Sequence, residues 1–307
     1  MDLSIIICTW NNSQRLGLTL QSIAECRIPA GLKWEIVLVN NNCTDDTDTV
    51  VQKFEDTIPI HYVKEPVQGL SRAKNTGLTA AKGELVLFTD DDVKPSVDWI
   101  ATYWKVYNNK PENYFFGGPV ESEFEIKKID EDLLNLAPPS VKGLDLGVQD
   151  KILGQNESFI SGNWACPLKP IAEAGGFDHD LGLNPSSGSV LTGEEYDLME
   201  RLKSKGFIPF YIHDAKVTHF VPKDKATLSH IASRSKGWGY YVGVMSAKTT
   251  DQLFTISGIP SYAYREFIHR SLKWLGAKIR RQKGYREYLA WCETIGKIKG
   301  YHNRSKR

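Results

Sequence analysis

The sequence predicts an α/β fold in which a mostly parallel central sheet is flanked by helices and followed by a helical, basic C-terminal extension. Through the first third of the chain, short apolar runs typical of buried strands alternate with amphipathic patterns typical of helices. The connections between them are short, which favours parallel strands joined by right-handed crossovers. With 307 residues, 41% hydrophobic and 24% charged, the chain is long enough to bury a substantial core.

The first four strands and the helices between them follow from this alternation. Asn11-Asn12-Ser13 caps the first helix, and Thr44-Asp45-Asp46 opens the second. Lys82-Gly83 ends the third helix directly before the fourth strand. The expected strands are 3–8, 34–39, 58–63 and 84–89, and the expected helices are 13–26, one that begins at 44–46, 69–81 and 96–108.

The pattern loosens after residue 109. A strand is expected at 114–120, where Gly117-Gly118-Pro119 allows a bend or a close backbone approach. Residues 121–157 are polar and irregular, and the small-residue stretch 185–193 is expected to be a mobile loop. The remaining expected elements are strands at 158–166, 208–212 and 216–220, helices at 169–174 and 194–205, and helices beyond residue 222.

Cysteine usage and the N-terminus indicate the compartment. The five cysteines are scattered without CxxC spacing, which argues for a reducing compartment and against a zinc site. The chain passes from Met1 almost directly into a strand, so no signal peptide is expected. No stretch approaches the roughly 20 apolar residues of a spanning helix. We therefore expect a cytoplasmic protein, either soluble or peripheral at the cytoplasmic face of the membrane.

Three consecutive carboxylates, Asp90, Asp91 and Asp92, directly follow the apolar strand 84–89. They would repel one another unless a cation or a hydrogen-bonding ligand lay between them. Open α/β sheets bind ligands at the carboxyl ends of their strands, and carboxylate oxygens suit Mg²⁺ or Mn²⁺ that also hold substrate phosphates. The alternative is an Asp-rich turn that caps the helix at 96–108.

Polar side chains also follow the first two strands, at Thr9-Trp10-Asn11 and at Asn40-Asn41-Asn42. Arg72 and Lys74 lie at the start of the third helix. An aromatic ring with amide and carboxylate partners can hold a nucleoside, and Arg72 with a cation can hold a diphosphate. The glycine-rich signatures of Rossmann dehydrogenases and P-loop NTPases are absent, so both classes are disfavoured.

The motif series resembles that of the family two inverting glycosyltransferases of the GT-A fold. The matching segments are 4–12, 35–47, 69–83, 87–93 and 193–202. The resemblance implies a catalytic domain at 1–222, with a nucleotide-sugar-binding half at 1–110 and an acceptor-binding half at 111–222. Residues 223–307 would form the helical extension. The implied reaction moves a hexosyl or N-acetylhexosaminyl group from a nucleotide-diphosphate sugar to an acceptor hydroxyl, in polysaccharide, glycolipid or cell-envelope glycan synthesis, and no nucleic-acid partner is expected.

The same resemblance implies the donor site. It assigns Asp92 as the principal ligand of Mg²⁺ or Mn²⁺ and Asp90 to the ribose or uracil side, with Asp91 as the intervening donor-site position. Thr9 and Trp10 match the pair that contacts the base in the family.

Asn40 departs from the family pattern, which usually has an Asp that accepts the hydrogen bond of uracil N3–H. The amide oxygen of Asn40 can still accept that bond, whereas its NH₂ group can face a carbonyl of another base. A UDP-linked sugar remains the expected donor.

Glu194-Glu195 correspond to the Glu-Asp motif at a helix start in the family, which implies that Glu195 deprotonates the acceptor hydroxyl with Glu194 beside it. Two adjacent carboxylates raise the pKa of one of them, and a general base can use this. The alternative is that both only complement the helix dipole. Glu in place of Asp adds one methylene group, which changes the reach of the base.

Three further residues are expected around the acceptor and the metal. Trp164 can stack on an acceptor sugar ring or pack in the core, and Gly118 is placed with it in the acceptor site. His219 matches a family position that in some members supplies a second metal ligand. A lone histidine at a strand end is also often simply hydrogen-bonded.

The net charge of +1 hides an asymmetry between the C-terminal segment and the rest of the chain. Residues 265–307 carry 13 Lys/Arg against 3 Asp/Glu, whereas residues 1–264 have a net charge of −9. From residue 257 onward, apolar residues at helical spacing accompany a basic face, which suits an interfacial helix on an anionic membrane surface. The alternative is that this apolar stripe packs on the catalytic domain. A carbohydrate or a lipid-linked molecule is the expected acceptor.

Two other functions fit the sequence less well than a glycosyltransferase does. A nucleotidyltransferase would need a Gly-rich loop with Lys or Arg after the first strand, and residues 9–15 lack it. A catalytically silent carbohydrate- or lipid-binding protein on the same fold is disfavoured by the intact acids of both clusters.

Overall fold

The computed structural model describes residues 1–110, 113–154, 157–184, 189–246 and 254–304. The predicted loop at 185–193 therefore lies in part outside the described residues. Internal contacts divide the chain into two compact units. Unit 1 comprises residues 1–123, 143–180 and 194–220, and unit 2 comprises residues 124–142, 181–193 and 221–307.

Unit 1 is built on an eight-stranded sheet of order β3-β2-β1-β4-β9-β6-β12-β8. The first four of these strands run parallel, β9 is antiparallel to both of its neighbours, and β6 and β12 are parallel. The strands in this order are Ile60–Lys64, Trp34–Asn40, Leu3–Thr9, Leu85–Asp90, Trp164–Pro167, Tyr114–Gly117, Ile208–Tyr211 and Lys151–Ile152. The predicted α/β class with a mostly parallel central sheet is thus confirmed.

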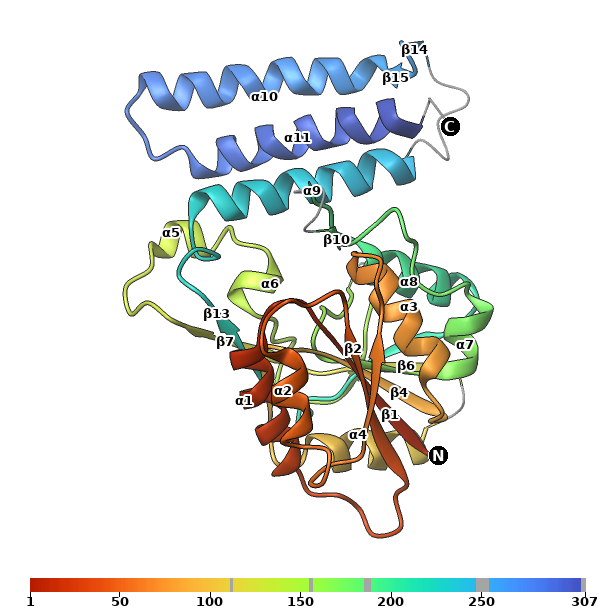
Figure 1. Cartoon of the computed structure of the whole chain (residues 1–307). Helices are drawn as coiled ribbons and strands as arrows, with labels where there is room; N and C mark the ends of the chain where they lie inside the picture. Colours follow the sequence, from red (N-terminus) through yellow and green to blue (C-terminus); the bar gives the residue numbers. More distant parts are fainter. Residues whose placement is uncertain (111–112, 155–156, 185–188, 247–253, 305–307) are drawn as a thin grey trace. The chain divides into compact units, whose positions relative to one another are not determined.

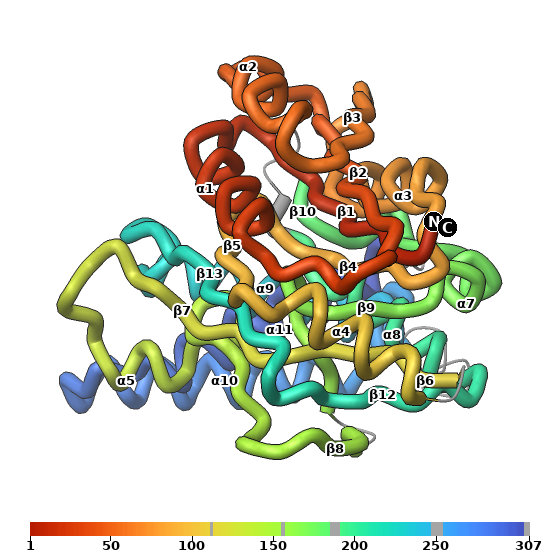
Figure 2. The backbone as a smooth tube through the Cα atoms, turned by 90° about the horizontal axis from the view of Figure 1, so that it is seen from below, coloured from red at the N-terminus to blue at the C-terminus, as the bar shows by residue number. Residues whose placement is uncertain are grey.

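Helices cover both faces of this sheet (Figure 1). Because side chains alternate along a strand, Ile5 and Ile7 of β1 join one core with α1, α2 and α4, and Ile6 joins the other core with α3, α7 and α8. These helices are α1 (Ser13–Ala24), α2 (Thr47–Gln52), α4 (Trp99–Asn108), α3 (Leu70–Ala80), α7 (Leu168–Glu173) and α8 (Glu194–Ser204). β1 and β4 lie side by side between the two layers (Figure 2).

Two expected strands differ from the observed ones. The strand predicted at 114–120 breaks at Gly118-Pro119 into β6 and β7 (Val120–Phe124). The strand predicted at 158–166 begins only at Trp164. Residues 161–162 form a turn instead, in which Gly162 adopts a φ of +89° and Ser161 bonds to a side chain of β4's end.

A second, three-stranded sheet has the order β5-β13-β7. β5 (Val93–Pro95) directly follows the triple acid, and β13 (Val217–Val221) pairs with it in antiparallel fashion. In this register His219 lies opposite Val93, so the pairing brings the histidine next to the acidic turn.

Unit 2 is mainly helical. α11 (Tyr285–Arg304) packs against both α9 (Leu228–Ser246) and α10 (Ser261–Ile279), as Figure 1 shows. The shorter elements are α5 (Glu131–Leu134), α6 (Pro139–Lys142) and the hairpins β10–β11 (Leu183–Asn184, Ser189–Val190) and β14–β15 (Thr255–Ile256, Ile259–Pro260). Within the described ranges, the helices are all too short or too polar to cross a bilayer.

Glycines set the close approach of α9 and α11. A Cβ atom on Gly239 would lie 1.9 Å from the carbonyl oxygen of Glu293, and one on Gly296 would lie 1.9 Å from that of Lys236. One turn later, Gly243 of α9 and Gly300 of α11 make similarly close contacts with the backbone of the other helix. The backbones therefore meet at a distance that only glycine allows.

We expect Gly239→Ala to destabilise unit 2 by about 1–3 kcal/mol, because the added methyl group must push two helix backbones apart. Urea unfolding followed by circular dichroism measures the change. Gly276→Ala is the matched control, since its Cβ would meet only the mobile end of Arg280, and alanine there should stabilise by about 0.4–1 kcal/mol. Equal effects of the two substitutions would contradict the packing argument.

Candidate active site

Three neighbouring strands deliver polar residues to one edge of the sheet. Asp90 is the last residue of β4, and Thr9 and Asn40 end β1 and β2. Thr9 and Asn40 are register partners, and Asp90 pairs with Cys8 of β1. Because these strands are parallel, their carboxyl ends meet at the same edge, as the sequence predicts.

Asp91 bonds to the end of β1 and to the first helix, α1. Its carboxylate accepts hydrogen bonds from Thr9 Oγ1 at 2.6 Å and Asn12 Nδ2 at 2.8 Å, and its backbone carbonyl accepts one from Thr19 Oγ1 at 2.9 Å. Burial, with a contribution from the carboxylate of Asp92, raises the pKa of Asp91 to about 7. In this structure Asp91 therefore holds the turn at residues 91–92, directly after β4, against Thr9, Asn12 and Thr19.

Asp90 is held by the turn that replaces the expected strand. Ser161 Oγ lies 3.0 Å from both carboxylate oxygens of Asp90. Burial raises the pKa of Asp90, the Lys74 ammonium opposes this, and the carboxylates of Asp92 and Glu195 add to it. Lys74, Asp92 and Glu195, which are far apart in the sequence, thus all affect the charge state of Asp90.

Asp92 and His219 face each other at the same edge. His219 Nε2 lies 3.4 Å from Asp92 Oδ1, and the two side chains are only 12% and 10% exposed. A carboxylate oxygen and an imidazole nitrogen are donors that Mn²⁺ accepts. Within the described residues no group of three or more acidic, His or Cys side chains is arranged to hold a metal. The pair therefore fits an ion that takes its other ligands from substrate phosphates and water.

The start of α8 presents Glu194 and Glu195 to a buried lysine of α3. Lys74 Nζ lies 3.4 Å from Glu194 Oε1 and also bonds to Glu195 Oε1. The three side chains are 4%, 7% and 12% exposed. Burial alone would lower the pKa of Lys74, but the carboxylates of Glu195 and Glu194 outweigh it and raise the pKa.

Lys74 changes the sequence-based account of this pair. From the sequence the two glutamates are expected to repel each other, whereas the structure places an ammonium group against both. Arg72, which the sequence analysis assigns to the donor diphosphate, is exposed on α3 and lines a cavity of about 330 Å³. The remaining lining residues of that cavity are Val63, Glu65, Asn75, Thr76, Thr79, Ala80 and His179.

The residues expected around the base differ in their surroundings. Trp10 is 43% exposed, and its ring is open to a ligand. Asn40 is buried, with its Nδ2 bonded to Tyr62 at 2.6 Å and to Asp48 at 3.1 Å. Its Oδ1 accepts the backbone N–H of Cys43 at 2.7 Å. The amide that the sequence assigned to the base is thus occupied inside the protein.

The structure does not place the two expected acceptor residues at a surface. Trp164 is fully buried, stacks on Phe88 with ring centroids 4.4 Å apart and meets the edge of Phe177. Its ring therefore offers no open face for a sugar, so of the two alternatives that the sequence left open, the structure shows core packing and corrects the assignment of Trp164 to the acceptor site. A Cβ atom on Gly118 would lie 2.1 Å from the carbonyl oxygen of Ala215, so this glycine serves a close backbone contact.

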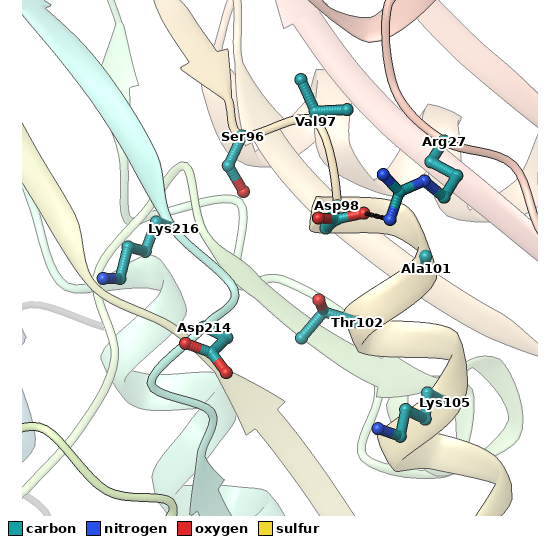
Figure 3. A pocket seen from close by; sticks show the side chains of 9 residues that line it. All are labelled: Arg27, Ser96, Val97, Asp98, Ala101, Thr102, Lys105, Asp214 and Lys216. Atoms are coloured by element: carbon teal, nitrogen blue, oxygen red, sulfur yellow. Dashed lines mark ion pairs between the residues drawn. The ribbon is translucent and has the colours of Figure 1, made fainter.

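A larger cavity of about 480 Å³ lies elsewhere in unit 1, and Figure 3 shows its lining. Its side chains carry both charge signs, and Arg27 and Asp98 form an ion pair at 2.5 Å. The other lining residues are Ser96, Val97, Ala101, Thr102, Lys105, Asp214 and Lys216. The described lining includes no residue of the acidic clusters.

Comparison with known proteins points to one family. The model of the family "Glycosyl transferase family 2" matches residues 4–157, which is half of the chain. A glucosyl-dolichyl phosphate glucuronosyltransferase of Haloferax volcanii is 24% identical over 255 residues, with 80% of this chain and 77% of that protein covered. A chondroitin synthase of Pasteurella multocida is 33% identical over 105 residues, which are 34% of this chain but only 11% of that protein.

Solved structures support the fold. S. aureus TarS in complex with UDP-GlcNAc superposes with a TM-score of 0.59 at 14% identity, over 97% of this chain and 80% of that one. A mannosyltransferase of Pyrobaculum calidifontis with GDP-Man and Mn²⁺ superposes with a TM-score of 0.58 at 16% identity, over 99% and 88%. These likenesses confirm the predicted GT-A fold. Because the family model matches half of this chain, the chain belongs to glycosyl transferase family 2.

Proposed function

We propose that this chain is a metal-dependent inverting glycosyltransferase that uses a nucleotide-diphosphate sugar. The observation that carries the proposal is that the Lys74 ammonium contacts Glu194 and Glu195 and also opposes the rise in the pKa of Asp90, while Asp92 of the same acidic run faces His219. One cluster suits a cation and a diphosphate, and the other suits a base. Membership of glycosyl transferase family 2 supports this division.

In the proposed donor complex, Trp10 contacts the base and Asp90 the ribose. The structural relatives do not decide which base the donor carries, because one is bound to a uridine nucleotide and the other to a guanosine nucleotide. Asn40 Oδ1 accepts the backbone N–H of Cys43 in the loop that follows β2, so we propose that Asn40 affects base choice through the shape of that loop. We keep a UDP-linked sugar as the preferred donor.

Asp92 and His219 are the residues that would hold Mg²⁺ or Mn²⁺. When bound, the ion would supply positive charge to the leaving diphosphate. The likeness to a mannosyltransferase with bound Mn²⁺ supports this choice of cofactor. The exposed Arg72 stays a proposed partner of the diphosphate.

In the proposed transfer step, the Glu195 carboxylate takes the proton of the acceptor hydroxyl. The hydroxyl oxygen forms a bond to the anomeric carbon from the face opposite the diphosphate, and the bond from that carbon to the phosphate oxygen breaks. The nucleoside diphosphate leaves with the bonding electrons, and the configuration inverts. Lys74 holds Glu195 in its orientation, because its ammonium contacts the carboxylates of both Glu195 and Glu194.

The acceptor we propose is a carbohydrate or a lipid-linked glycan, and the sugar moved is a hexose or an N-acetylhexosamine. The Haloferax relative, which matches most of this chain, is named for a dolichyl phosphate substrate. We also propose that the C-terminal segment meets an anionic membrane surface, where such acceptors reside, and that residues 1–222 and 223–307 serve as catalytic domain and extension.

Glu195→Gln should lower transfer about 100- to 10,000-fold while the donor still binds, because the amide cannot accept the proton. Metal-dependent release of nucleoside diphosphate and calorimetric titration with the donor measure the two effects. Glu55→Gln, at an exposed position, is the control. If Glu194→Gln proves the more damaging substitution, the base is Glu194 and our assignment is wrong.

Asp92→Asn should abolish the stimulation of donor turnover by Mn²⁺, because a neutral amide binds the cation far more weakly than a carboxylate. Turnover is measured across a Mn²⁺ titration, with Asp56→Asn at an exposed position as the control. An unchanged metal dependence in Asp92→Asn would remove this residue from the metal site.

Lys74→Met should destabilise the protein by about 3–5 kcal/mol, because it leaves two buried carboxylates without their cation. Urea unfolding is the measurement, and Lys82→Met on an exposed lysine is the control. Lys74→Met combined with Glu194→Gln and Glu195→Gln should recover part of the loss. A single Lys74→Met variant as stable as the unmodified chain would disprove the role of the ammonium.

A further inference from the structure

One face of α10 carries a row of exposed apolar side chains. Ile268, Leu272, Leu275 and Ile279 are 58%, 64%, 53% and 74% exposed. Their spacing of four, three and four residues places them on a single side of the helix. We name these four residues the α10 stripe. Single exposed apolar residues are common on protein surfaces, but a continuous row on one helix face is not.

The stripe is not the packing face of the helix. The opposite side of α10 already packs in unit 2, where Trp274 and Phe267 stack on Trp291 of α11 with ring centroids 4.5 Å and 6.4 Å apart. Ala263 and Ala277 on that side are buried. α10 therefore uses one face for the fold and presents a second apolar face that the described unit 2 does not cover.

Basic residues border the stripe. On a helix of this geometry Arg265 and His269 lie nearest the stripe on one side and Lys278 on the other, Lys273 lies farther round, Arg280 follows the helix end, and all five are exposed. The one acidic residue in the sequence of α10, Glu266, bonds to Lys297 of α11 at 3.0 Å and so faces inward. The exposed face combines an apolar centre with a cationic rim.

We propose that α10 docks on an anionic bilayer, lying parallel to the surface with the α10 stripe among the acyl chains. Lysine and arginine side chains at the rim extend toward the headgroups and complement their negative charge. A helix with one apolar face and a basic rim suits this interfacial position. A second copy of this face is a poorer partner, because two cationic rims would be brought together.

This inference rests on the proposed function, because docking of α10 would hold the enzyme at the membrane where lipid-linked acceptors lie. Vesicle binding is measured without donor or acceptor, so it succeeds or fails independently of catalysis. Loss of donor turnover with intact vesicle binding would count against the proposed function alone.

The test is flotation of the full chain with vesicles of phosphatidylcholine alone or mixed with phosphatidylglycerol. The protein should float with the mixed vesicles and bind neutral vesicles at least about tenfold less. Leu272→Gln with Leu275→Gln should lower binding to mixed vesicles at least about tenfold, because both glutamines keep the helix but remove the apolar contact. Donor turnover in solution should be unchanged.

Leu18→Gln with Val148→Gln is the matched control, since both positions are exposed and lie outside unit 2. Arg265→Glu with Lys273→Glu separates the charge contribution and should reduce binding to mixed vesicles only. Failure of the unmodified chain to float with mixed vesicles would overturn the proposal. So would equal flotation of the Leu272→Gln, Leu275→Gln variant, or a dimer in solution that this variant abolishes without any vesicle binding.

Discussion

The buried ammonium of Lys74 is the contact on which the arrangement of unit 1's acids depends. The two glutamates at the start of α8 are largely buried, and isolated buried carboxylates would be costly. Lys74, which is 4% exposed, offsets that cost by contacting both. It also acts on Asp90, whose pKa burial raises and this ammonium lowers. A single cation thus links the end of β4, the face of α3 and the start of α8.

The sheet explains why these groups meet. β1, β2 and β4 are parallel and end at one edge, so residues from three distant parts of the sequence are brought together there without long loops. The small sheet of β5 and β13 adds His219 beside Asp92. The turn at residues 161–162 replaces a predicted strand and supplies the hydroxyl that holds Asp90. The residues that the sequence predicts as the first half of a strand thus form a turn that supports the site.

The sequence predicted the sheet and its acidic edge because both depend on local patterns, apolar runs followed by acids. It did not predict Lys74, because lysines are rarely buried and its two partners lie more than a hundred residues away. The sequence left Trp164 open between the acceptor site and the core, because only its packing with Phe88 and Phe177 decides between the two. The glycines of α9 and α11 are visible in the sequence, but their pairing is a tertiary contact.

The central claim is that the two acidic clusters form one site for a metal and a nucleotide sugar. The most direct measurement is anomalous diffraction from crystals that contain Mn²⁺ and a nucleoside diphosphate. The account predicts a manganese peak beside Asp92 and His219, with the diphosphate between this ion and Glu195. A manganese ion away from Asp92, or a nucleotide bound in the cavity lined by Arg27, Asp98 and Lys216, would contradict it.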